Sequence, residues 1–155
     1  CWVAGQGPDT ERLQQQYAHD SRIRWLGRIS EADKLARLRG ATIFCAPSLH
    51  GESFGIVLAE AMAARTAVVA SALDGYRNVA TDGVDAALVP PGDVDALAGA
   101  LGSLLVDEQR RTQLVRGGRL RAEQLSMATL VERYHEIYLD LLDARGRRAG
   151  RPGAA

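Results

Sequence analysis

Short apolar runs alternate with amphipathic segments along most of the chain. The runs are rich in β-branched and aromatic residues and predict strands at 1–5, 23–27, 42–47, 67–71 and 86–90. The amphipathic segments predict helices at 11–20, 30–40, 53–64, 94–107, 108–125 and 126–145, with a further short helix within 75–85. This alternation predicts an α/β fold, with an open, mostly parallel sheet and helices on both faces.

In open parallel sheets, ligands bind outside the carboxyl ends of the strands. That rule selects three loops, at 5–9, 27–34 and 47–55. The first, in "AGQGPDT", resembles a dinucleotide fingerprint but has Thr10 at the third glycine position and Pro8 in the middle. It predicts a tight turn in which Gly5 and Gly7 take unusual backbone angles.

Composition narrows the classes of partner. The 155 residues are 46% apolar and 25% charged with a formal net charge of zero, which predicts a single domain over 1–144 and no nucleic-acid partner. The Gly-, Pro- and Arg-rich segment 145–155 predicts a disordered tail. No apolar run reaches the ~20 residues of a membrane span and no signal peptide is visible, so a cytoplasmic location is expected. Cysteine and histidine spacings predict no metal site.

The segment 48–60, "SLHGESFGIVLAE", carries the main candidate chemistry. A helix starting at about Ser53 would present unpaired backbone N–H groups to an anion, and Gly55 would let a ligand approach closely. Glu52 would then lie beside the anion and accept hydrogen bonds from sugar hydroxyls. Eight helical residues rise about 12 Å, so Glu60 would hold another part of an extended ligand rather than share a proton with Glu52. Spacing alone favours the alternative, a capped helix with two ordinary glutamates, because two glutamates eight positions apart are common.

The longer segment "CAPSLHGESFGIVLAEAMAARTAVVAS" resembles the E-x7-E region of retaining GT-B glycosyltransferases of family four, group 1. The segments "VAGQGPDTERL", "IRWLGRIS" and "VPPGDVDALAGAL" also resemble family sequences and occur in the same order, so the resemblance covers 2–142. It implies a Rossmann-like, C-terminal, donor-binding domain with a truncated start. An N-terminal acceptor-binding domain would lie upstream, together with an Arg and a Lys that clamp the donor diphosphate.

The resemblance also implies roles for individual residues. Glu52 matches the first glutamate, a catalytic position near the donor sugar, and Glu60 matches the second, which binds the ribose. The donor sugar and diphosphate would be bound by His50, Gly51, Ser53, Phe54, Gly55 and Ile56. No metal or other cofactor is implied, because helix N–H groups and cationic side chains stabilise the departing diphosphate.

The resemblance places the base of the nucleotide at Ile29, Glu31 and Lys34. Guanine presents two N–H donors and a carbonyl acceptor, which a carboxylate and an ammonium complement, whereas uracil offers a single N–H between two carbonyls. This favours GDP over UDP. The alternative is that Glu31 and Lys34 are solvated charges in the first turn of a helix.

Within the family, the chain most resembles actinobacterial members that mannosylate phosphatidylinositol. This implies GDP-mannose as donor, a phosphatidyl-myo-inositol-type lipid as acceptor and a peripheral place on the inner face of the plasma membrane. Two alternatives stay open: a UDP- or ADP-sugar with a soluble acceptor, and a non-catalytic nucleotide-binding module, which the unusual His50 and Arg65 would permit. The chain alone is expected to be inactive, and the terminal helix would cross to the missing domain, leaving its apolar stripe exposed here.

Overall fold

The computed structural model describes residues 1–149. The chain divides into two compact units, Cys1–Ala41 and Thr42–Ala155. Each unit is described by itself.

The first unit contains two parallel strands and two helices. Their bounds are β1 (Trp2–Ala4), α1 (Thr10–Gln16), β2 (Arg24–Gly27) and α2 (Glu31–Gly40). In the register of the strands, Trp2 lies opposite Arg24. Ser30 caps α2, because the N–H of Asp33 donates to its Oγ at 3.1 Å. A local hydrogen bond therefore sets the start of α2 where the sequence predicted it.

The predicted turn after β1 is half right. Gly5 takes a φ of 113°, in the region that favours glycine, but Gly7 does not take a positive φ. The N–H of Gly7 instead donates to Thr10 Oγ1 at 2.8 Å, at the start of α1. The threonine that breaks the dinucleotide fingerprint thus orders this turn.

The second unit holds a three-stranded parallel sheet in the order β3-β4-β5. Its elements are β3 (Ile43–Ala46), α3 (Ile56–Ala63), β4 (Ala67–Ser71), α4 (Asp74–Arg77), β5 (Ala87–Val89), α5 (Val94–Val106), α6 (Glu108–Gln124) and α7 (Met127–Ala149). The predicted α/β class with parallel strands is confirmed. Strands β1 and β2 pair within the first unit, and β3, β4 and β5 pair within the second.

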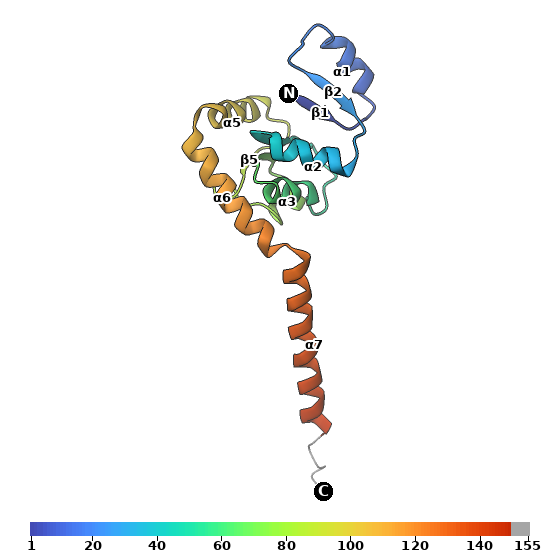
Figure 1. The fold of residues 1–155 in the computed structure, drawn as a ribbon, viewed down its shortest axis with the longest axis vertical. Helices are drawn as coiled ribbons and strands as arrows, with labels where there is room; N and C mark the ends of the chain where they lie inside the picture. The colour runs from blue at the N-terminus through green and yellow to red at the C-terminus, as the bar shows by residue number, and fades with distance from the viewer. Residues whose placement is uncertain (150–155) are drawn as a thin grey trace. The chain divides into compact units, whose positions relative to one another are not determined.

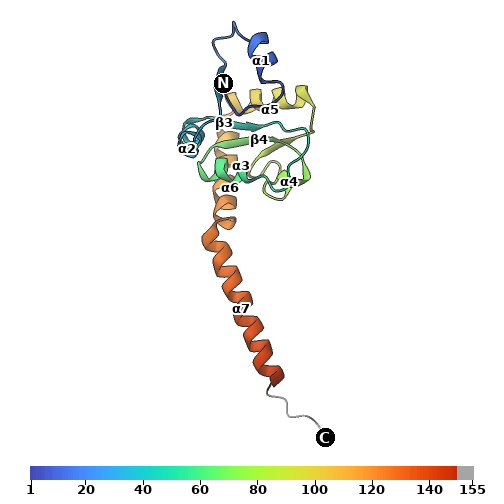
Figure 2. The ribbon, with the colours of Figure 1, turned by 90° about the vertical axis from the view of Figure 1, so that its right-hand side faces the viewer.

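The core of the second unit is built on β4. All five of its residues are buried, and because successive side chains of a strand point to opposite faces, both faces of the strand are covered. Val69 packs with Leu104 of α5 and Leu114 of α6. Figure 2 shows α5 on one side of β3 and β4 and α3 on the other, as predicted.

Helix α6 fixes the loop before β5. The guanidinium of Arg121 donates to the carbonyls of Val79 and Asn78, each at 2.8 Å. Gly117 lets this loop approach the helix, since a Cβ atom there would overlap the carbonyl of Val84 and lie 3.2 Å from the Cα of Asp85. The Arg121 guanidinium and the lack of a side chain at Gly117 therefore both hold the loop before β5 against α6.

Helix α7 is longer than predicted and follows α6 as the orange and red end of the ribbon in Figure 1. It ends at Ala149, within the segment expected to be disordered. A single glycine such as Gly146 costs a helix only about 1 kcal/mol. The rest of the predicted tail, 150–155, lies outside the described residues.

Candidate functional site

The loop after β3 carries the candidate residues, but the helix that follows it starts later than predicted. Gly55 takes φ 87° and ψ 38°, a left-handed conformation, and α3 begins at Ile56 rather than near Ser53. Gly51 also has a φ of 87°. The two glycines keep Ser53 and Phe54 out of the helix, so the sequence prediction of the helix start was wrong by about one turn.

This start changes the geometry of the two glutamates. Glu52 lies in the loop, whereas Glu60 lies within α3. The 12 Å estimate assumed one continuous helix, and only the four steps from Ile56 to Glu60 are helical, which rise about 6 Å. Both side chains are half-buried. Their separate roles, at the sugar and at the ribose, stay predictions.

The start of α3 is suited to an anion. In any helix the first N–H groups have no intrahelical acceptor, and here these belong to Ile56 and Val57, while the N–H of Leu58 donates to Gly55 at 2.9 Å. Ile56 is 64% exposed and Phe54 is 46% exposed, so a ligand has access to this end of the helix. The helix dipole adds positive potential there.

Helix α4 supports the loop from beneath. A Cβ atom on Gly75 would overlap the backbone carbonyl of Glu52 and lie 2.9 Å from the carbonyl carbon of Ser53. A Cβ atom on Gly55 would lie 2.7 Å from Cδ1 of the Tyr76 ring. The backbone of the loop therefore rests directly on Gly75 and Tyr76. Sequence analysis missed both residues, and the only signal for them is the Gly-aromatic pair in the short helix.

The buried Tyr76 also carries a polar link. Its side chain is 2% exposed, and its hydroxyl lies 3.1 Å from Ser48 Oγ, at the start of the loop. Burial raises the pKa of the phenol above its usual value, the hydrogen bond with Ser48 opposes this, and the charge of Glu52 raises the pKa further. The phenol is therefore neutral at physiological pH, with the Glu52 carboxylate within electrostatic reach.

The remaining predicted loop residues are accessible. His50, Gly51 and Ser53 are all exposed. The neighbouring Leu49 is 61% exposed and lies beside the turn after β5, where a Cβ atom on Gly92 would be 3.8 Å from its Cδ2. The predicted sugar and diphosphate residues thus lie along the loop after the carboxyl end of β3 and at the first residue of α3, and all but Gly55 are exposed.

The predicted base-binding residues lie in the first unit. Ile29 is half-buried before α2, and the Lys34 ammonium lies 2.8 Å from a carboxylate oxygen of Glu31 within the first turn. The Glu31 side chain is 86% exposed. An acceptor and a donor are therefore adjacent at an accessible helix start.

Arg65 lies at the opposite end of α3. Its N–H donates to Met62 at 3.0 Å, and the N–H of Thr66 donates to Ala61 at 3.0 Å, the two hydrogen bonds of a Schellman motif. Arg65 occupies the left-handed position of that motif with a φ of 63°. Arg65 is exposed, so having arginine instead of glycine at this position affects the end of the helix rather than the packing of the core.

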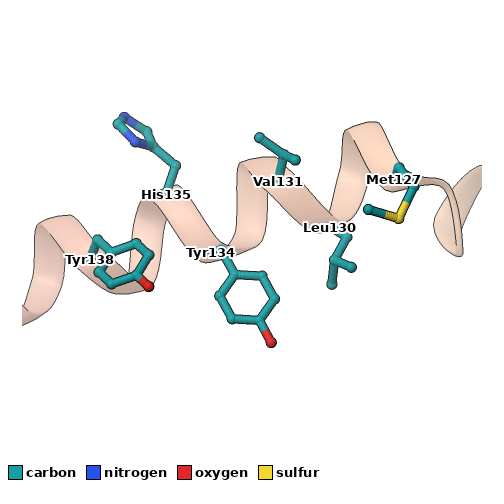
Figure 3. Close-up of a pocket in the computed structure, with 6 residues that line it drawn as sticks. All are labelled: Met127, Leu130, Val131, Tyr134, His135 and Tyr138. Carbon is teal, nitrogen blue, oxygen red and sulfur yellow. The ribbon is translucent and has the colours of Figure 1, made fainter.

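An apolar stripe along α7 is exposed, as expected. A pocket on this helix, shown in Figure 3, is lined by Met127, Leu130, Val131, Tyr134, His135 and Tyr138. The exposed fractions along the stripe range from 43% at Leu130 to 71% at Met127. This pocket contains no residue of the Glu52 loop.

Two further properties of residues 1–149 bear on function. Nowhere in this part of the chain do three or more His, Cys, Asp or Glu side chains gather where they could hold a metal ion. Within the same residues, no helix combines the length and the apolar character needed to cross a membrane.

Comparison with known proteins gives consistent matches. Residues 1–121 match the family described as "Glycosyl transferases group 1". The phosphatidyl-myo-inositol mannosyltransferase of Mycolicibacterium smegmatis is 39% identical over 99% of this chain, and that of Mycobacterium leprae is 40% identical over 88%. The chain spans only 39% and 36% of the length of these two relatives.

Solved structures give the same fold. The sucrose-phosphate synthase of Thermosynechococcus elongatus superposes with a TM-score of 0.77 and 29% identity, over 92% of this chain and 38% of that one. HepE of Anabaena, in complex with UDP-glucose, gives a TM-score of 0.78 with 23% identity, over 90% of this chain and 40% of that one. The family match and the mycobacterial relatives confirm the resemblance to group 1 glycosyltransferases, and the solved structures confirm the fold.

Proposed function

The chain belongs to the glycosyl transferases group 1 family, and from this premise we propose that it is the donor-binding half of a retaining mannosyltransferase. Its donor would be GDP-mannose and its acceptor a phosphatidyl-myo-inositol-type lipid. The observation that carries this proposal is the 39% identity, over 99% of the chain, to a phosphatidyl-myo-inositol mannosyltransferase. The exposed Glu52 loop at the start of α3 is consistent with it.

The proposed reaction uses the geometry of that loop. The diphosphate would lie at the N–H groups of Ile56 and Val57, the sugar beside Glu52 and His50, and the ribose near Glu60. The bond from the anomeric carbon to the diphosphate breaks as the acceptor hydroxyl forms a new one on the same face. The acceptor proton passes to the departing phosphate oxygen. Helix N–H groups stabilise the charge that develops there, so no metal is required.

Selection of guanine would come from α2. Glu31 would accept hydrogen bonds from the guanine N–H groups and Lys34 would donate to the carbonyl, with Ile29 packing on the base. Removing the carboxylate by Glu31→Ala should weaken GDP binding about tenfold, because hydrogen bonds to charged groups contribute about 1.5–3 kcal/mol. Binding of UDP should change little.

The experiment is titration of GDP and UDP into the wild type and the variant by calorimetry. Glu11→Ala is the matched control, since Glu11 is an exposed carboxylate in the first turn of α1. A variant that keeps its preference for GDP would refute the assignment of Glu31 to the base.

Transfer would need a second, acceptor-binding domain, and the lipid acceptor would bring the protein to the inner face of the plasma membrane. Residues 1–155 alone should therefore bind nucleotide weakly and transfer no sugar. The measurement is release of GDP from GDP-mannose in the presence of phosphatidylinositol vesicles. Appreciable transfer by this chain alone would contradict the two-domain proposal.

A soluble acceptor is the second candidate. The D-inositol 3-phosphate glycosyltransferase of Xylanimonas cellulosilytica is 38% identical over 71% of this chain, which spans 26% of that protein. The complete protein encoded by the gene can be offered inositol phosphate and phosphatidylinositol side by side, with GDP- and UDP-sugars. Transfer to the soluble inositol alone would favour this candidate.

A further inference from the structure

Three contacts from α4 converge on the Glu52 loop. The Tyr76 hydroxyl lies 3.1 Å from Ser48 Oγ at the start of the loop, and the Tyr76 ring lies against Gly55 at its end. Gly75 lies under the backbone between Glu52 and Ser53. Tyr76 is thus linked to both ends of the loop and is itself almost fully buried.

The middle of the loop is exposed and contains glycine. Gly51 takes a left-handed conformation, and a Cβ atom there would meet nothing within 4 Å. His50, Gly51 and Ser53 are exposed. Because glycine has the greatest conformational freedom of any residue, this segment depends on the contacts from α4 for a defined conformation.

We propose that Tyr76 is a positioning residue for sugar transfer: through its hydrogen bond with Ser48 and its ring contact with Gly55, it fixes the loop that places Glu52 at the donor sugar. The proposal rests on the proposed function. Tyr76 touches neither the sugar nor the reacting atoms. It acts by holding the carboxylate in place before the donor binds, which lowers the cost of reaching the reactive arrangement.

The geometry separates the two parts of the tyrosine. Tyr76→Phe keeps the ring against Gly55 and removes only the bond to Ser48. The helix start and Glu60, which would hold the diphosphate and the ribose, lie beyond Gly55 on α3. Loss of the hydroxyl should therefore disturb Glu52 and leave nucleotide binding nearly intact.

The test combines exchange and kinetics on the complete protein encoded by the gene. In Tyr76→Phe, amide hydrogen exchange over residues 50–55 should accelerate about fivefold, as expected for one neutral hydrogen bond, and kcat for mannose transfer should fall by a similar factor. The dissociation constant for GDP should stay within about twofold of the wild type, because the groups expected to hold the nucleotide are untouched. Exchange in β4 should not change.

Partner variants make the test specific. Ser48→Ala should reproduce the effect of Tyr76→Phe, the double variant should be no worse than either single one, and Ser48→Thr should retain most of the wild-type behaviour. Tyr17→Phe is the matched control, because Tyr17 is 42% exposed and lies in the other unit.

Unchanged exchange over 50–55, or equal acceleration there and in β4, would overturn the proposal, since the latter marks a merely structural residue. If the wild type transfers no mannose, the proposed function fails. Local exchange then still decides whether Tyr76 fixes the loop.

Discussion

The two units of the chain hold their candidate residues by different means. In the first unit, side-chain contacts are largely between near neighbours in sequence: Arg12 with Asp9 at 2.9 Å and Lys34 with Glu31 at 2.8 Å. The cap of α2 is equally local, between residues 30 and 33. One contact joins residues far apart in sequence: the Arg37 guanidinium lies 5.0 Å from the centre of the Trp2 ring.

In the second unit the corresponding contacts join distant segments. The Ser48–Tyr76 bond spans 28 positions, and the bond of Arg121 to Val79 spans 42. Gly75 supports the backbone of Glu52. Exposed ion pairs between near neighbours contribute little to stability. Buried contacts contribute more, because a close-packed interior cannot absorb a change in side-chain volume. Substitutions of supporting residues should therefore lower stability less in the first unit than in the second, where they should also disturb the Glu52 loop.

The largest effect is expected from Gly75→Ala. The added methyl group would overlap the backbone of Glu52, and overpacking of this kind costs about 1–3 kcal/mol of unfolding free energy. Because the loop must move, donor binding should also weaken by at least about tenfold, the equivalent of 1.4 kcal/mol. Urea denaturation and calorimetry with GDP-mannose measure the two effects.

Gly102→Ala is the control for that substitution. A Cβ atom at this position in α5 would meet nothing within 4 Å, so alanine should stabilise the helix by about 0.5–1 kcal/mol. Equal effects of the two substitutions would show that the loop does not depend on α4.

A smaller effect is expected at the start of α2. Ser30→Ala removes the cap of the helix and should lower the free energy of unfolding by about 1 kcal/mol. Ser30→Thr should restore it, because a hydroxyl both accepts the N–H of Asp33 and donates to the Asp33 carboxylate, as Ser30 does. Donor affinity should fall less than in Gly75→Ala. A fall in donor affinity larger than that in Gly75→Ala would contradict the difference between the two units.

The smallest effect is expected at the far end of α3, where the second unit has a local feature of its own. Left-handed backbone costs an ordinary residue about 1–2 kcal/mol, partly offset by the greater unfolded-state entropy of glycine, so Arg65→Gly should stabilise the protein by about 0.5–1 kcal/mol. Arg65→Ala, which keeps the strain, should change stability little. Thermal unfolding of the three proteins distinguishes these outcomes, and destabilisation by glycine would contradict the strain argument.

Much of the fold was accessible from hydrophobic patterning. All five strands were predicted within one or two residues, because buried parallel strands are short apolar runs between turn residues. The start of α2 was also predictable from the capping serine. The start of α3 was not, because nothing in "GESFG" shows that both glycines adopt left-handed conformations and delay the helix to Ile56.

The sequence by itself determined the α/β class, the family and the grouping of His50, Glu52 and their neighbours on one loop, because these depend on local hydrophobic pattern and on sequence motifs. Only the tertiary structure decided how that loop is supported. Gly75 and Tyr76 lie more than twenty positions away in the chain and reach it by packing, which leaves no periodic trace in the sequence.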